Sequence, residues 1–169
     1  MIVPSSVIGR LLYEISADAN LPSRVYACGM MMYHAFIEYI CGEDSPEGFQ
    51  DADCVIVGIT CLILSVKFNE DFINSVEVVS DTAPVKSRSI RVIDSAARAV
   101  LSYGASQDTL STEQLLFVRD KIKAVVCEMS VLRILGNFAT RIPIDPNTDS
   151  MSPQQLVDSY SSPHCLAGK

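Results

Sequence analysis

The sequence predicts an all-α fold, and two observations lead to this prediction. The first is the stretch DADCVIVGITCLILSVKF, residues 51–68, which is apolar on every side and too long for a typical strand. The second is that apolar residues recur at helical spacing through further segments on both sides of it. Because a helix that is apolar all round must be covered all round, residues 51–68 are expected to form the centre of the fold.

The first two helices are expected at residues 5–17 and 22–41. Pro22 opens the second helix, and Gly42 is a left-handed stop at its end. Both helices carry one apolar stripe, formed by Val7, Ile8, Leu11, Leu12 and Ile15 in the first and by Val25, Cys28, Met32, Phe36, Tyr39 and Ile40 in the second.

Two more long helices are expected after the central one. The fourth covers residues 85–104, and the fifth is a continuous helix over residues 113–135 that ends at Gly136. Ser111 and Gln114 have the spacing of a capping box at the start of the fifth helix. The segment 71–80 between the third and fourth helices fits either a short helix or a strand, and Asp51 is the expected N-cap of the third.

The end of the chain differs in composition from the part before it. Residues 144–169 are rich in Pro, Ser, Asp and Asn, with room for one short helix near residues 152–159. The sequence therefore predicts a domain over residues 1–143 followed by a polar, loosely held tail.

Composition narrows the classes of partner. The chain has 169 residues, of which 49% are hydrophobic, and a formal net charge of −7. Direct binding to nucleic acid is disfavoured, since that affinity depends on clustered Lys and Arg. The apolar stretch 54–66 is shorter than the roughly 20 residues that cross a bilayer, so no membrane association is expected. The N-terminus lacks a secretory pattern, so an intracellular setting, nuclear or cytoplasmic, is expected.

The residues of common catalytic and metal sites are not arranged in their usual motifs. The six cysteines form no C-x-x-C pair and are expected to be free, mostly buried thiols rather than zinc ligands. No phosphate-binding loop, nucleophile elbow or zinc-protease motif occurs. His34 and Cys28 lie six residues apart and do not face each other on a helix, so His34 is expected to be packed or at an edge. We expect no enzyme activity, no cofactor and no small-molecule substrate.

Two charged residues stand where the apolar pattern would have allowed an apolar one. Lys67 ends the central helix, and Glu128 flanks the apolar stripe of residues 113–135. Each has an ordinary explanation: a cation complements the C-terminal dipole of a helix by under about 1 kcal/mol, and an acid on a long helix is usually solvated.

Around these residues the sequence resembles the cyclin family. GITCLILSVKFNED, residues 58–71, is similar to the third helix of the cyclin box, A-x-x-C-L-x-L-A-x-K-x-E-E. EMSVLRILGNF, residues 128–138, is similar to the end of its fifth helix. NLPSRVYACGMMMYHAFIEY, residues 20–39, resembles the second helix of the transcription-type cyclins. The resemblance covers roughly residues 5–143, and within the family it is most similar to cyclin Q and its relatives.

This resemblance implies a five-helix cyclin box with the third helix central. It also implies a non-catalytic regulatory subunit that binds and allosterically activates a cyclin-dependent serine/threonine protein kinase in cell-cycle or transcription regulation. The pair Lys67 and Glu128 is then expected to hydrogen-bond main-chain groups around the kinase's regulatory αC helix. The kinase-binding residues that the resemblance implies are Lys67, Glu128, Leu64, Phe68, Glu70 and Phe138.

Several positions depart from the cyclin pattern and keep a second reading open. Ala35, Asn69 and Thr140 replace residues that are usual in the family, and about fifteen extra residues near 71–85 lengthen the link between the third and fourth helices. SPQQLVDSY, within the tail, resembles only the start of a second box. The alternative is a cyclin-fold adaptor or scaffold that binds no kinase, as in some general transcription factors and pocket proteins.

Overall fold

The structure is a computed structural model that describes residues 5–41, 51–76, 88–104, 112–140 and 142–166. Over these residues it consists of α-helices and short 3-10 helices without strands, which confirms the predicted all-α class. The α-helices are α1 (Ser5–Asp18), α2 (Ser23–Cys41), α3 (Asp51–Phe68), α4 (Glu70–Val76), α5 (Arg88–Gly104), α6 (Thr112–Val125), α7 (Glu128–Leu135) and α8 (Pro153–Tyr160). The 3-10 helices are η1 (Gly136–Thr140), η2 (Pro146–Ser150) and η3 (Pro163–Leu166).

Helix α3 occupies the core, as its uniformly apolar sequence predicts. It packs against α1, α2, α5 and α7, and its residues Ile59 and Leu62 are fully buried. The contact with α2 is close enough that a Cβ on Gly29 would lie 3.3 Å from the Cα of Leu62. The hydroxyl of Ser65 donates a hydrogen bond of 2.6 Å to the carbonyl oxygen of Val25. This bond opposes sliding of α3 along α2. No helix in the described ranges combines the length and apolar character needed to cross a membrane.

Helices α1 and α2 form a hairpin whose turn contains Asn20, a non-glycine residue with a φ of 55°. Asn tolerates this left-handed conformation better than most residues, which suits it to the tight turn before Pro22. The phenol of Tyr26 donates a hydrogen bond of 2.9 Å to the carbonyl oxygen of Gly9 across the hairpin. Arg98 of α5 forms an ion pair of 2.5 Å with Asp18 at the end of α1.

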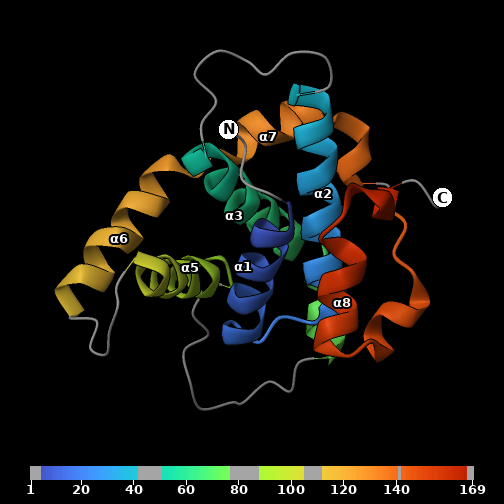
Figure 1. Ribbon diagram of the computed structural model, residues 1–169, viewed down its shortest axis with the longest axis horizontal. Coiled ribbons are helices and arrows are strands. Elements are labelled where there is room, and N and C mark those ends of the chain that lie inside the picture. The colour runs from blue at the N-terminus through green and yellow to red at the C-terminus, as the bar shows by residue number, and fades with distance from the viewer. Residues whose placement is uncertain (1–4, 42–50, 77–87, 105–111, 141, 167–169) are drawn as a thin grey trace.

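The C-terminal segment packs on the hairpin, so the expectation of a loosely held tail is wrong. Figure 1 shows α8 alongside α2, on the opposite side of the molecule from α5 and α6. Leu156 and Tyr160 of α8 are buried, and the hydroxyl of Tyr160 lies 2.8 Å from that of Thr148. The short helix predicted near residues 152–159 is confirmed, and Ser152 begins it with a complete capping box. A few apolar residues spaced on one helix face were enough to dock a segment of polar composition.

The predicted fifth helix is two helices. The chain leaves helical geometry at Cys127, where φ is −123° and ψ is 55°, so α6 and α7 are separate. Figure 1 shows α6 leading away from the rest of the fold beside α5. The apolar periodicity continues across the break, which is why it predicted a single helix. A contact with α3, described below, is what the periodicity could not reveal.

The remaining segments are only partly described. Helix α4 covers residues 70–76 and so includes the first part of the ambiguous stretch 71–80. The rest of the extended link near residue 85, and the helix ends predicted at Gly42 and Ser111, lie outside the described residues, as does the side chain of Asp51. The helix end predicted at Gly136 is confirmed.

Candidate functional site

Lys67 lies in the last turn of α3, where the buried helix reaches the surface. Leu64, one turn earlier, is 3% exposed, whereas the Lys67 side chain is 54% exposed. Positive charge is favourable at this position because the carbonyl end of a helix carries partial negative charge. The last turn of α3 therefore presents an ammonium group at the edge of the core.

Glu128 is the first residue of α7, where a carboxylate complements the positive end of the helix dipole. Its Oε1 atom lies 2.6 Å from the Nζ of Lys67. That oxygen is buried and has no other hydrogen-bond partner among the described residues, so the ammonium group is what compensates its charge. The structure thus brings together the two charged residues that the sequence singled out, with each at the favourable end of its own helix.

The ion pair contributes little to the stability of the fold. The Glu128 side chain is 30% exposed and that of Lys67 is more than half exposed, so water screens their attraction. Pairs of this kind typically contribute under about 1 kcal/mol. The pair therefore adds little to the packing of α3 against α7, and more than half of the Lys67 side chain stays accessible to solvent.

The other four predicted site residues differ in accessibility. Phe68 is 44% exposed beside Lys67, and Glu70 is exposed at the start of α4. Phe138, in η1, is partly buried against the core. Leu64 belongs to the core, which disagrees with its expected contact with a partner, because a side chain buried to this degree offers almost no surface. Its spacing on α3 matched the cyclin pattern, but an all-round apolar helix gives no sign of which side faces out.

Asn69 joins α3 to α4 and is used within the chain. Its side-chain amide donates a hydrogen bond of 2.8 Å to the carbonyl oxygen of Ser65, and its own carbonyl accepts one of 2.9 Å from the N–H of Ile73. These bonds satisfy a carbonyl at the end of α3 and begin α4. The position at which the cyclin pattern has an acid therefore acts here as a helix joint.

The sequence reasoning overlooked Thr60, which lies where α3 meets the break between α6 and α7. Thr60 is fully buried, and its Oγ1 lies 3.5 Å from the backbone nitrogen of Cys127 and 3.8 Å from its Sγ. One signal was available, since Thr60 and Ser65 are the polar residues within the apolar run 54–66. A polar residue in such a run needs a hydrogen-bond partner.

His34 and Cys28 are occupied separately. The Nε2 of His34 lies 2.7 Å from the carbonyl oxygen of Tyr160, so the buried ring acts as donor to α8. Burial lowers the pKa of His34, and the hydrogen bond to Tyr160 opposes this shift in part. Burial raises the pKa of the Cys28 thiol, so a reactive thiolate is disfavoured there. Both side chains serve the interior, in agreement with the expectation of a packed histidine.

The cysteines with described side chains are free thiols, as predicted, and three of them are buried: Cys28, Cys54 and Cys61. Burial raises the pKa of Cys165 to about 11 and that of Cys61 further. In the part of the chain that the structure describes, no three His, Cys, Asp or Glu side chains gather as a metal site would need.

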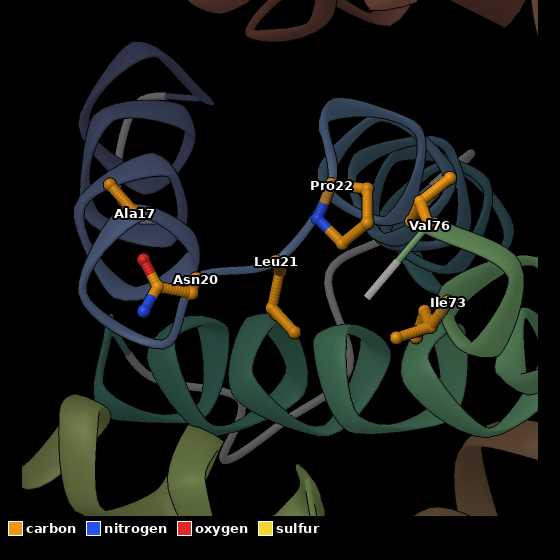
Figure 2. Close-up of a pocket in the computed structure, with 6 residues that line it drawn as sticks. All are labelled: Ala17, Asn20, Leu21, Pro22, Ile73 and Val76. Carbon is orange, nitrogen blue, oxygen red and sulfur yellow. The ribbon is translucent and has the colours of Figure 1, made fainter. Parts of the chain in front are cut away.

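A groove of about 390 Å³ lies between the α1–α2 turn and α4. Figure 2 shows Ala17 near the end of α1, Asn20, Leu21 and Pro22 in the turn that follows, and Ile73 and Val76 on α4. Ligand sites usually combine apolar walls with several converging polar groups. Among these lining residues Asn20 alone has a polar side chain, so the Lys67–Glu128 pair is the stronger candidate site.

Comparison with known proteins adds no assignment: no protein family matches the chain, and neither a curated protein nor a solved structure is found to match it.

Proposed function

We propose that the chain is a non-catalytic regulatory subunit that binds and activates a cyclin-dependent kinase, and that it has the helix arrangement of a cyclin box. The observation that carries the proposal is the ion pair between Lys67 and Glu128, which joins the end of α3 to the start of α7 at the surface. These are the two charged residues that the resemblance to cyclins assigns to contacts with main-chain groups around the kinase's αC helix. They come from helices that are distant in the sequence, so a local sequence pattern could not predict that they lie side by side.

The chemistry of the pair suits recognition of a helix end. An ammonium group offers three donors and a carboxylate offers only acceptors, so together they can satisfy both kinds of unpaired backbone group. Phe68 supplies exposed apolar surface beside them. Interfaces commonly combine an apolar centre with a few polar anchors, and this surface has both components.

Activation in this proposal is a shift of a conformational equilibrium in the kinase. A kinase is active when a Glu of its αC helix pairs with the catalytic Lys. A partner that binds the active arrangement more tightly than the inactive one shifts the population by that difference in affinity. The proposed subunit therefore needs no catalytic group of its own.

The alternative is a cyclin-fold adaptor that binds no kinase, and the position of Asn69 favours it. The Asn69 side chain donates its hydrogen bond to the carbonyl oxygen of Ser65 within the chain, rather than to a partner. A carboxylate at the matching cyclin position would have been free to contact a kinase. One departure of this kind weakens a contact at the edge of the proposed surface but leaves Lys67 and Glu128 in place.

The test is reconstitution of the purified chain with a panel of purified cyclin-dependent kinases. At least one kinase is expected to bind and to gain activity toward a peptide substrate. Lys67→Ala and Glu128→Ala are each expected to raise the Kd at least tenfold, which is about 1.4 kcal/mol. The matched control is Arg98→Ala, which removes a similarly exposed ion pair with Asp18 elsewhere in the fold and should leave the Kd unchanged. Wild-type affinity in both site variants would refute the proposed surface, and no binding across the panel would favour the adaptor.

A further inference from the structure

We infer that Thr60 is a positioning residue that sets where α7 begins and thereby holds Glu128 beside Lys67. The inference deepens the proposed function and rests on it for its biological meaning, since the pair it positions is the proposed kinase-binding surface. The geometry that it explains is present in the free chain.

The backbone leaves helical geometry between α6 and α7, at Cys127. In a continuous α-helix the N–H of residue 127 would bond to the carbonyl oxygen of residue 123. Cys127 instead has non-helical angles, and its N–H points to the hydroxyl oxygen of Thr60 on α3 at an N to O distance of 3.5 Å. Regular helical bonding surrounds this point, from the N–H of Val126 to Ile122 and from the N–H of Val131 to Cys127. The interruption is therefore confined to one place, and Thr60 lies at it.

The Thr60 hydroxyl can both donate and accept a hydrogen bond. It has one proton, which it donates to the carbonyl oxygen of Ile56 in a bond of 2.7 Å. Its remaining capacity is as an acceptor, which is what the N–H of Cys127 requires. The side chain is fully buried, so water cannot take its place. Cys127 is itself partly buried, so its N–H has limited access to water and loses stability without an acceptor, which ties the start of α7 to this hydroxyl.

Thr60 lies on the same helix as Lys67, and the residue it contacts, Cys127, is next to Glu128. Thr60 and Lys67 are seven residues apart on α3, which places them on the same face two turns from each other. Cys127 and Glu128 are consecutive at the start of α7. The two helices are thus joined at two points, Thr60 with Cys127 and Lys67 with Glu128. If the first contact is lost, the start of α7 is free to move and the second contact loses its fixed geometry.

The experiment compares Thr60→Val, which keeps the shape and removes the hydroxyl, with Thr60→Ser, which keeps the hydroxyl. In the free chain, a double-mutant cycle on unfolding with Lys67→Ala and Glu128→Ala measures how strongly the pair is coupled. A two- to fivefold coupling is expected with Thr or Ser at position 60, in the range of exposed pairs. Thr60→Val is expected to reduce it below 1.5-fold. Amide exchange at Cys127 should become at least tenfold faster in Thr60→Val, with the α3 amide of Ile63 unchanged.

The kinase arm of the experiment separates this inference from the proposed function. With a binding kinase, Thr60→Val should raise the Kd three- to tenfold alone and have no further effect when Glu128 is already Ala, a non-additivity that general destabilisation does not produce. If no kinase binds, the proposed function fails and the free-chain coupling still decides the role of Thr60. Unchanged coupling in Thr60→Val overturns the inference whatever the kinase result. Should Thr60→Val fail to fold, Thr60→Ala read against Thr60→Ser isolates the same hydroxyl.

Discussion

Single polar residues in this chain do their work by reaching the backbone of distant segments. Ser65 donates to the carbonyl oxygen of Val25, and His34 donates to that of Tyr160. Such bonds are invisible to sequence patterns, because a buried histidine and a solvated one look alike in an apolar helix. The meeting of Lys67 with Glu128 was expected only from a resemblance that spans two helices, because periodicity alone does not pair residues of different helices.

The buried ring of His34 predicts a loss of stability in mild acid. Its pKa is lowered in the folded chain, so the unfolded chain binds the proton more readily. The stability that the neutral ring supports is fully present above its unfolded pKa of about 6.5 and is lost as the pH falls from there toward the folded value. Urea unfolding between pH 7.5 and 5.5 should show a decline of up to about 1.4 kcal/mol per pH unit.

The control for this prediction is a pair of glutamine variants. His34→Gln, whose amide can still donate to the carbonyl oxygen of Tyr160, is expected to have a flatter pH profile than the parent chain. His164→Gln removes the other histidine, which is exposed and apart from this contact, and serves as the matched comparison. A profile for His34→Gln as steep as that of the parent would show that another group is responsible.

At the scale of elements, boundaries that depend on local chemistry were predicted and those that depend on tertiary contacts were not. The stop at Gly136 follows from the residue itself, and the structure confirms it. The division of α6 from α7 depends on Thr60, which is more than sixty residues away in the chain. Position 127 carries an ordinary helix-compatible cysteine, so nothing local announces the break.

The end of α7 gives a clean test of backbone strain. Gly136 has a φ of 55° and a ψ of −131°, a combination that residues with a Cβ rarely adopt. No described atom lies within 4 Å of the position a Cβ would take, so Gly136→Ala adds strain without a clash. We expect the free energy of unfolding to fall by about 1–3 kcal/mol. Thermal or urea unfolding measures this, with the exposed Ser130→Ala on α7 as control, and equal stability of the two variants would contradict the assigned strain.

At the scale of the whole molecule, segments on both sides of the predicted boundary at residue 143 pack against each other. Segments from the two ends of the chain share one interior, since α8 lies on α1 and α2. Composition misled here because a polar segment can still carry a few well-placed apolar residues, in this case Leu156 and Tyr160. The central position of α3 was predictable from the sequence, whereas the packing of α8 on α1 and α2 was not.

Gly9 of α1 lies close to Ser161 of the C-terminal segment, and this contact predicts an asymmetry between two glycines. A Cβ on Gly9 would overlap the side chain of Ser161, coming within 2.7 Å of its Cβ and 3.1 Å of its Cα. The nearest atoms to a Cβ on Gly58 would be side-chain methyl groups of Leu12 and Ile8, at 3.3–3.4 Å. Both glycines are in helices, so the gain in helix propensity from alanine is the same. Gly9→Ala is therefore expected to be less stable than Gly58→Ala by about 1–3 kcal/mol in urea unfolding.

A compensating change identifies the cause of that difference. Adding Ser161→Gly to Gly9→Ala removes the atoms that a new methyl group would strike, and it should restore most of the lost stability. If Ser161→Gly does not restore stability, the loss of stability in Gly9→Ala does not come from the contact between α1 and the C-terminal segment.

The docking of α8 on the α1–α2 hairpin also orders events during biosynthesis. The α1–α2 hairpin is translated before α8, the helix that covers its outer side, with α3 to α7 made in between. Until α8 has been made, the apolar side chains of the hairpin that it will cover stay exposed to water and to chaperones that bind nascent chains. The outer side of the hairpin is therefore covered only once α8 has been made, well after the central helix α3.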